Sequence, residues 1–249
     1  MLELVRRAPQ PFTLAAAVAL WEVLARVLHP PWLPSASAVA AAWWQLATTG
    51  QFAELGSSAR TLAIGLVVVF LAGGALALAV SLSSILDEAL SPYFNAALSI
   101  PTIALVPAFI LLWGLSDVTR VATVVSFALV PLVIQWAVAA RSLPADLLEM
   151  ARSFDASPAR RLASVALPAS APVLITGVRI AVVQGIKGVV SAEILIGVIG
   201  IGKLLQVAIL TFDLARLYAV IVTLLVATFA VYLTLERAER RASRRTSAP

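Results

Sequence analysis

Long apolar stretches follow one another along the chain, separated by short segments that contain proline, glycine or charged residues. A helix needs about 20 mostly apolar residues to cross a hydrocarbon core of about 30 Å. Six stretches approach this length, and the sequence lacks the apolar–polar alternation of a membrane β-barrel. The pattern predicts an all-α membrane protein, a single polytopic bundle over residues 1–249 of about six transmembrane helices. The predicted spans are 12–28, 61–82, 96–115, 118–140, 171–196 and 217–235.

The first predicted span is the weakest of the six because it is short and charged. Glu22 and Arg26 stand four residues apart, which places them on one helical face where they can pair. Arg6 and Arg7 ahead of the span resemble the basic start of a signal peptide. The apolar run continues past Trp21 without a clear small-residue cleavage site, so we expect an uncleaved membrane helix.

Residues 30–59 separate the first two spans and contain three prolines near their start. Ser37 is positioned to cap a short helix, in which Val39, Trp43 and Leu46 recur at helical spacing. This pattern predicts a helix at the membrane interface, where tryptophan is enriched. Two interpretations remain open: a docking face for an external partner, or a brace for the bundle.

Composition and charge support the membrane assignment. The chain is 61% hydrophobic and 12% charged, whereas an average soluble domain is roughly 25% charged. This excludes a soluble enzyme and a disordered chain, and the absence of cysteine excludes a disulfide-stapled module. The segments expected inside hold eleven basic residues and those expected outside hold five, which predicts cytoplasmic N- and C-termini. The basic residues form no stripe, so no nucleic-acid partner is expected.

The sequence offers no catalytic constellation, and it lacks the histidines and cysteines for a metal site built on them. His29 is the single histidine, and there is no cysteine. Gly197, Gly202 and Lys203 resemble a phosphate-binding loop, but Leu204 stands where a Ser or Thr would hold magnesium. We interpret Gly197, Gly200 and Gly202 as a flexible outer turn after the fifth predicted span. The chain is expected to be a non-enzymatic subunit without a cofactor of its own.

The fifth predicted span is unusual because it carries Arg179, Lys187 and Glu193, with Gln184 between them. A charge at mid-membrane costs about 2.5–3.5 kcal/mol on insertion scales, so this helix is expected to avoid lipid. At 100° per residue the three charges occupy one broad face. We interpret this face as the lining of a translocation path. The alternative is that the charges pair with each other or brace the ends of the helix.

Residues 141–170 form the longest polar interruption and lie on the predicted cytoplasmic side. Asp155 ends a first short helix, and Ser157 with Pro158 begins a second one. The first helix carries an apolar stripe at positions i, i+3, i+4 and i+7, which are Leu147, Met150, Ala151 and Phe154. Such a stripe suits a groove on another protein, or it packs back onto the bundle.

This segment resembles the cytoplasmic Glu-Ala-Ala loop of binding-protein-dependent ABC importer permeases. The loop of that family reads Glu-Ala-Ala, three residues, Gly, nine residues, Ile, one residue, Leu-Pro. The matching positions here are Glu149, Met150, Ala151, Asp155, Val165, Leu167 and Pro168. Asp155 replaces the glycine, and Asp is among the few residues that tolerate positive φ. The turn can therefore survive while its fit against a partner changes.

Three further stretches, 33–39, 100–114 and 177–193, resemble the nitrate/sulfonate/taurine branch of these permeases. Together the likeness covers roughly residues 30–215. It implies a type I importer in the bacterial cytoplasmic (inner) membrane. In such an importer two permease subunits, here expected to be a homodimer, work with two cytoplasmic ATPase subunits and an external substrate-binding protein. ATP and magnesium are bound by the partner ATPase.

The resemblance also implies roles for individual residues. Glu149, Ala151 and Asp155 would contact the ATPase, and the helical stripe adds Leu147, Met150 and Phe154. The solute implied is small and anionic or polar: nitrate-, sulfonate- or taurine-like, or a vitamin precursor. A stand-alone secondary transporter is the alternative, but such carriers are built from inverted repeats and the sequence shows none.

Overall fold

The computed structural model describes residues 10–141, 149–150, 157, 160, 164–165 and 167–246, and these contain helices and connections but no strand. The all-α prediction is confirmed. The helices in chain order are α2 (Gln10–Leu28), α3 (Ala36–Thr48), α4 (Ala53–Val68), η1 (Val69–Gly73), α5 (Gly74–Leu82), α6 (Ser84–Ser99), η2 (Thr102–Leu105), α7 (Val106–Trp113), α8 (Asp117–Arg141), α11 (Leu167–Ile196), α12 (Ile201–Leu210) and α13 (Leu214–Thr246).

Four helical stretches of the described chain are long and apolar enough to cross a membrane: Ala53–Leu82, Asp117–Ala139, Leu167–Ile196 and Leu214–Arg240. A fifth is obtained if the bent pair α6 and α7 forms one span. The sequence predicts about six, and the difference lies in the first and third predicted spans. Helix α2, which contains predicted span 12–28, is not among the four. Its Glu22 and Arg26 do pair, at 2.6 Å.

The third predicted span, 96–115, is not a continuous helix. Helix α6 ends at Ser99, and the chain bends by 92° before η2 and α7 continue. Proline lacks an N–H and disfavours the helical conformation of the residue before it. Ile100 accordingly has φ −79° and ψ 129°, and Pro101 begins the turn. The sequence predicts one span over 96–115, and the structure divides it into two helices, because Pro101 ends α6 rather than kinking a continuous helix.

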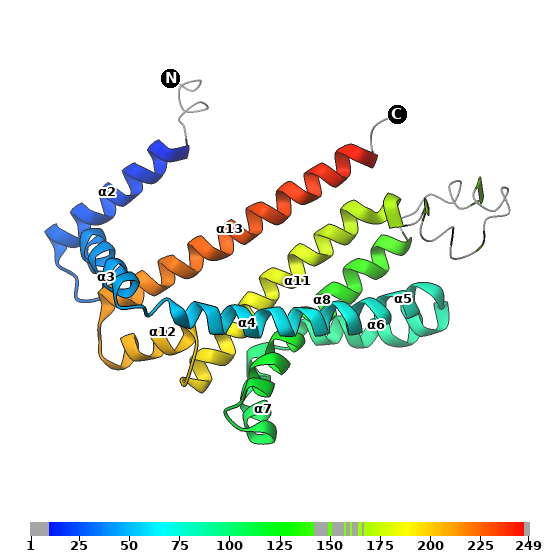
Figure 1. Ribbon diagram of the computed structural model, residues 1–249, viewed down its shortest axis with the longest axis horizontal. Coiled ribbons are helices and arrows are strands. Elements are labelled where there is room, and N and C mark those ends of the chain that lie inside the picture. Colours follow the sequence, from blue (N-terminus) through cyan, green and yellow to red (C-terminus); the bar gives the residue numbers. More distant parts are fainter. Residues whose placement is uncertain are drawn as a thin grey trace.

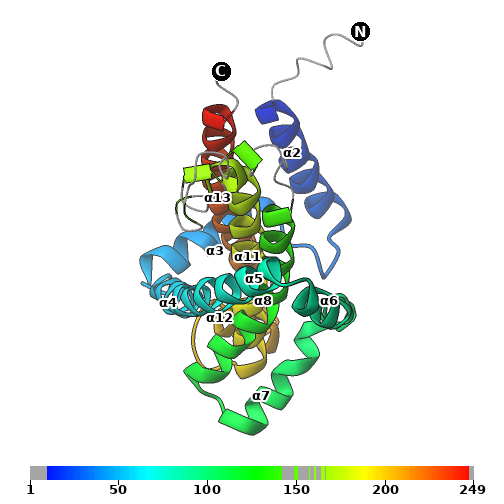
Figure 2. The same ribbon diagram turned by 90° about the vertical axis from the view of Figure 1, so that its right-hand side faces the viewer.

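Figure 1 shows α8, α11 and α13 running in similar directions while α4 and α5 cross them. Helix α12 lies towards one side of the bundle. The opposite side holds the start of α2, the end of α13, and the ends of α8 and α11 that border residues 142–166. In the side view, α7 turns away from the bundle below α6 (Figure 2). The segment 142–166 therefore joins two long helices at the side where α2 begins and α13 ends.

Helices α8 and α11 pack closely along their length, because α11 presents small residues to α8. These residues recur at helical spacing and are buried: Gly177, Ala181, Gly185, Gly188 and Ala192. A Cβ atom at Gly188 would lie 3.1 Å from the carbonyl oxygen of Thr123 on α8. Small residues that allow two backbones to approach are the usual contact between membrane helices. The two helices thus form one tightly packed pair.

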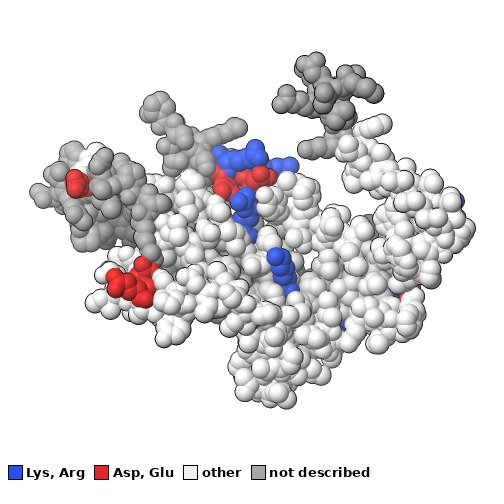
Figure 3. Space-filling view, turned by 180° about the vertical axis from the view of Figure 1, so that it is seen from behind, with Lys and Arg blue, Asp and Glu red and all other residues white. Residues whose placement is uncertain are grey.

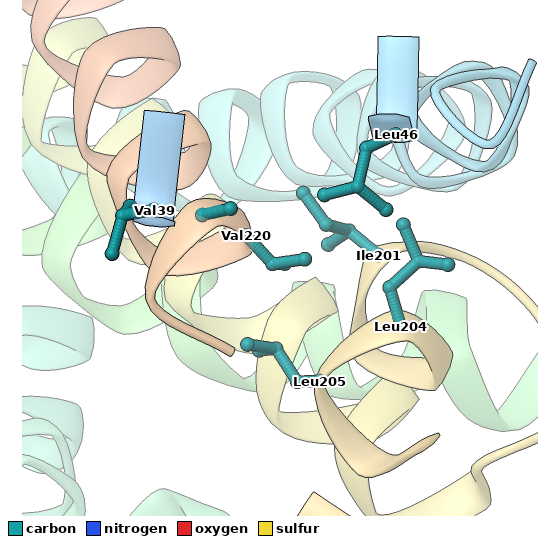
Figure 4. Packing of buried hydrophobic residues seen from close by; sticks show 7 residues of the cluster. Val39, Leu46, Ile201, Leu204, Leu205 and Val220 are labelled. Carbon is teal, nitrogen blue, oxygen red and sulfur yellow. The ribbon is translucent and has the colours of Figure 1, made fainter. Parts of the chain in front are cut away.

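Besides the packed pair of α8 and α11, the protein has a hydrophobic core where α3 covers α12 and α13. In Figure 4, side chains from these three helices point toward one another; the labelled ones are Val39, Leu46, Ile201, Leu204, Leu205 and Val220. Leu46 is only 2% exposed, so this face of α3 braces the bundle. Ser35, not Ser37, caps α3 by accepting a bond from the Ala38 amide at 3.2 Å. Ser37 is occupied instead, because its amide and hydroxyl both donate to Glu22.

Candidate functional site

Glu193 lies at the end of α11 away from residues 142–166, and its side chain is fully buried. Its carboxylate accepts hydrogen bonds from the Ser58 hydroxyl of α4 at 2.7 Å and from the Gly202 amide of α12 at 3.2 Å. Arg120 of α8 donates to the other oxygen at 3.3 Å and forms an ion pair with it. One side chain of α11 therefore joins three other helices.

Further polar contacts extend this arrangement. Arg120 also bonds Ser57 at 3.2 Å and pairs with Asp117 on its own helix. Glu54 accepts from Lys203 at 3.0 Å and from the Gly200 amide at 2.8 Å. We call this set the Glu193 cluster; its members are Glu54, Ser58, Asp117, Arg120, Glu193 and Lys203. A buried charge is tolerated only when it is paired and hydrogen-bonded, and Glu193 meets both conditions.

The glycine-containing connection between α11 and α12 is packed rather than open. Gly200 has φ +85°, a conformation that glycine adopts readily, and a Cβ there would lie 2.2 Å from the Glu193 carboxyl carbon. At Gly202 a Cβ would lie 2.4 Å from the Glu193 backbone carbonyl carbon. The expectation of a flexible turn was wrong, because the glycines make room for Glu193 and bring amide donors to Glu54 and Glu193.

The phosphate-loop-like string in this connection has a structural role. Lys203, the residue that would contact a phosphate, is paired with Glu54. Replacing Lys203 by Met is expected to lower stability by less than about 1 kcal/mol, since the pair is partly exposed and screened. ATP binding by the purified chain should be absent in both proteins. Thermal unfolding and a nucleotide-binding titration of both proteins check this, and nucleotide binding that depends on Lys203 would contradict it.

Arg179 lies nearer the other end of α11 and is held by α13. Its guanidinium forms an ion pair with Glu239 at 2.9 Å and sits 5.2 Å from the centre of the Tyr232 ring. Cation–π contacts of this kind add to the attraction of the ion pair. The charge of Arg179 is therefore engaged between two helices.

Lys187 is exposed and lines a groove of about 490 Å³ between α11 and α13, next to Val183, Leu224 and Tyr232. Within the described chain it has no hydrogen-bond or ion-pair partner. Gln184, one turn away, is half-buried. In the space-filling view from behind, charged side chains are confined to a few places on an otherwise uncharged surface (Figure 3).

The structure thus separates the charges of the fifth predicted span. Arg179 and Lys187 both face α13, whereas Glu193 faces α4, α8 and α12. Position along the helix explains this better than the angle around it, because Arg179 and Glu193 stand about 40° apart at 100° per residue but about 21 Å apart along the axis, where different helices pack against α11. Arg179 and Glu193 pair with residues of other helices and not with each other. Sequence reasoning missed Arg120 as a partner; the signal available was that a charge inside a span needs an opposite charge nearby.

The predicted coupling segment is only partly described. Leu147, Ala151, Phe154 and Asp155 lie outside the described residues. Glu149 and Met150 are helical and exposed. The amide of Arg160 donates to the Ser157 hydroxyl at 3.3 Å, which confirms the predicted cap of the second short helix.

Several relatives are membrane transport proteins. A riboflavin transport system permease protein, RibX of Chloroflexus aurantiacus, is 32% identical over 155 residues, which are 62% of this chain and 58% of that protein. A nitrate import permease protein, NrtB of Leptolyngbya laminosa, is 29% identical over 153 residues, 61% of this chain and 55% of that protein. The chain thus spans less than two thirds of the length of these two relatives. A formylaminopyrimidine transport permease protein, ThiX of Halalkalibacterium halodurans, is 27% identical over 195 residues and 78% of each chain.

A solved structure shares the fold. A chain of the MetNI methionine ABC transporter, in an inward-facing conformation, aligns with a TM-score of 0.64 and 18% identity, covering 78% of this chain and 98% of that chain. The apolar helices and these relatives make the chain a multi-pass membrane protein. Residues 69–245 match the family described as binding-protein-dependent transport system inner membrane component. The chain belongs to this family, and the prediction of a type I ABC importer permease is confirmed.

Proposed function

We propose that the chain is the permease subunit of an ATP-driven importer in the bacterial inner membrane. In this proposal two copies of the chain enclose a path for a small anionic or polar solute, which an external binding protein delivers. Two cytoplasmic ATPase subunits bind ATP and magnesium. The observation that carries the proposal is the family match over residues 69–245, which includes both the coupling segment and the charged helix α11.

The arrangement of helices supports a mechanical role for the coupling segment. Residues 142–166 connect α8 to α11, and these two helices pack along their length. Arg120 of α8 and Glu193 of α11 join the same two helices again at the far end. A closely packed pair that is tied at its far end moves as one body. A displacement of the coupling segment by the ATPase would therefore reach the opposite side of the membrane.

The proposed contact with the ATPase is the helix around Glu149, with Leu147, Met150, Ala151, Phe154 and Asp155. Met150 is 52% exposed, so about half of its apolar side chain is open to a partner. Both termini would lie on this cytoplasmic side, in agreement with the excess of basic residues there.

The experiment is to purify the tagged permease from its native membranes and to measure ATPase activity in the eluate. The wild-type protein should carry the ATPase subunit. Ala151→Arg should lower the co-purified activity at least tenfold, because a guanidinium on the apolar stripe is costly to bury in the ATPase groove. Ala238→Arg is the control; Ala238 is exposed near the end of α13 and lies outside the coupling segment in the sequence.

Three results are informative. Loss of activity in Ala151→Arg alone supports the proposed coupling helix. Equal activity in all three proteins would place the ATPase contact elsewhere on the permease. A wild-type protein that purifies without any ATPase subunit would refute the proposed function itself.

A further inference from the structure

The open groove between α11 and α13 combines an apolar wall with one ammonium group. Val183, Ile186 and Val190 of α11 and Leu224 and Phe229 of α13 line it, and Lys187 is exposed among them. At 1.5 Å per residue, Lys187 lies about 30 Å from the start of α11 and about 14 Å from its end. It is therefore well inside the helix that crosses the membrane.

Lys187 differs from the basic residues nearest to it on α8 and α11. Arg120 pairs with Glu193 and Asp117, and Arg179 pairs with Glu239. In the described chain Lys187 has no such partner, although an ionised residue inside a span normally pairs or faces a water-filled cavity. This face of α11 and α13 is thus unsuited to lipid.

We propose that this groove is one half of a binding site for a small anion, that a second copy of the chain supplies the other half, and that Lys187 binds the anion. The inference rests on the proposed function. In a two-fold dimer the same patch of both subunits meets, so the groove faces its own copy and a second Lys187.

The carboxylates of the four long helices favour an anion from outside the protein as the partner of Lys187. On the four long helices, Glu54, Asp117, Glu193, Glu236 and Glu239 each have a basic partner. A second copy therefore brings no free carboxylate from these helices to Lys187, but brings another ammonium group. The positive charge of the closed groove is left for the solute to neutralise.

The lining also defines the kind of anion. An ammonium group is a compact charge with three donors, which suits a single oxyanion group. The remaining wall is apolar and cannot replace a tightly held hydration shell. The site should therefore favour weakly hydrated monoanions, such as nitrate or methanesulfonate, over sulfate.

The lysine content of the chain allows a direct test. Lys187 and Lys203 are the two lysines of the sequence, so permease dimers grown with ¹³Cε-lysine give one lysine signal from the groove and one from the Glu54 pair. Lys187→Arg identifies the groove signal by removing it. Sodium nitrate and sodium methanesulfonate are the probes, and sodium sulfate at equal ionic strength is the comparator.

The Lys187 signal should shift saturably at roughly millimolar nitrate or methanesulfonate, shift less with sulfate, and leave Lys203 unchanged. Parallel shifts of both signals would indicate ionic strength alone and would overturn the proposal. An unmoved Lys187 signal with both monoanions would overturn it as well.

The second copy is tested by cross-linking, which is simple because the chain has no cysteine. Lys187→Cys should form a disulfide or short-linker dimer in membranes. Leu71→Cys, 72% exposed on another span, is the control and should not. Cross-linking at residue 71 and not at 187 would overturn the proposed interface. ATPase co-purification separates the two ideas, since a permease that carries its ATPase but binds no anion leaves the proposed function intact.

Discussion

Replacing Glu193 by Ala should destabilise the protein by about 3–5 kcal/mol, the range for breaking a buried ion pair by removing one partner. The change leaves Arg120 without its buried partner, since its remaining ionic partner Asp117 is 70% exposed. It also leaves the Gly202 amide without its acceptor, and it leaves the Ser58 hydroxyl with only the longer contact to the Glu54 carbonyl at 3.4 Å. Thermal unfolding of the purified permease in detergent, followed by circular dichroism, measures the loss.

A double-mutant cycle shows whether the charge pair causes the effect. Arg120→Ala should also be strongly destabilising, and the double variant should cost less than the sum, because no unpaired buried charge remains. Glu236→Ala is the control, since Glu236 pairs with Arg240 on an exposed face of α13 and its loss should leave the midpoint unchanged. Additive single effects would refute coupling between Glu193 and Arg120.

The spans that could be predicted from sequence are those in which apolar content alone decides. Stretches 61–82, 118–140, 171–196 and 217–235 all fall within long helices of the structure. The apolar pattern was less informative at 96–115, because whether the helix continues there depends on how Pro101 and the residue before it are accommodated. A proline inside α8 at Pro131 leaves that helix continuous, so the residue type alone does not tell a kink from a break.

Among the polar contacts, those between residues close in the sequence could be predicted, whereas those between distant residues could not. The spacing of Glu22 and Arg26 and the cap at Ser157 depend on neighbours in the sequence, and both were predicted. The pairing of Glu193 with Arg120 joins residues 73 positions apart, and that of Lys203 with Glu54 joins residues 149 apart. Such contacts depend on how helices cross. The sequence signals only that these charges require partners, not which residues supply them.

Replacing Gly202 by Ala should be among the most damaging single changes in the chain. The added Cβ would lie 2.4 Å from the Glu193 carbonyl carbon and 2.5 Å from the Ile194 backbone nitrogen, and backbone atoms of a packed helix cannot move aside as a side chain end can. Overpacking of this kind costs about 3 kcal/mol, which corresponds to roughly 6–12 °C in the thermal midpoint of a chain of this size. The loss should exceed that of most apolar truncations on the surface.

Gly56→Ala provides the matched comparison, because Gly56 also lies within a helix but has nothing within 4 Å of its added Cβ. Alanine is the better helix former by about 0.5–1 kcal/mol, so this variant should be as stable as the parent or slightly more so. The two variants add the same methyl group, and their difference therefore reports the contact between α12 and α11. If Gly202→Ala unfolded at the same temperature as Gly56→Ala, α12 would not pack against Glu193, and the amide donors assigned to the Glu193 cluster would be lost with it.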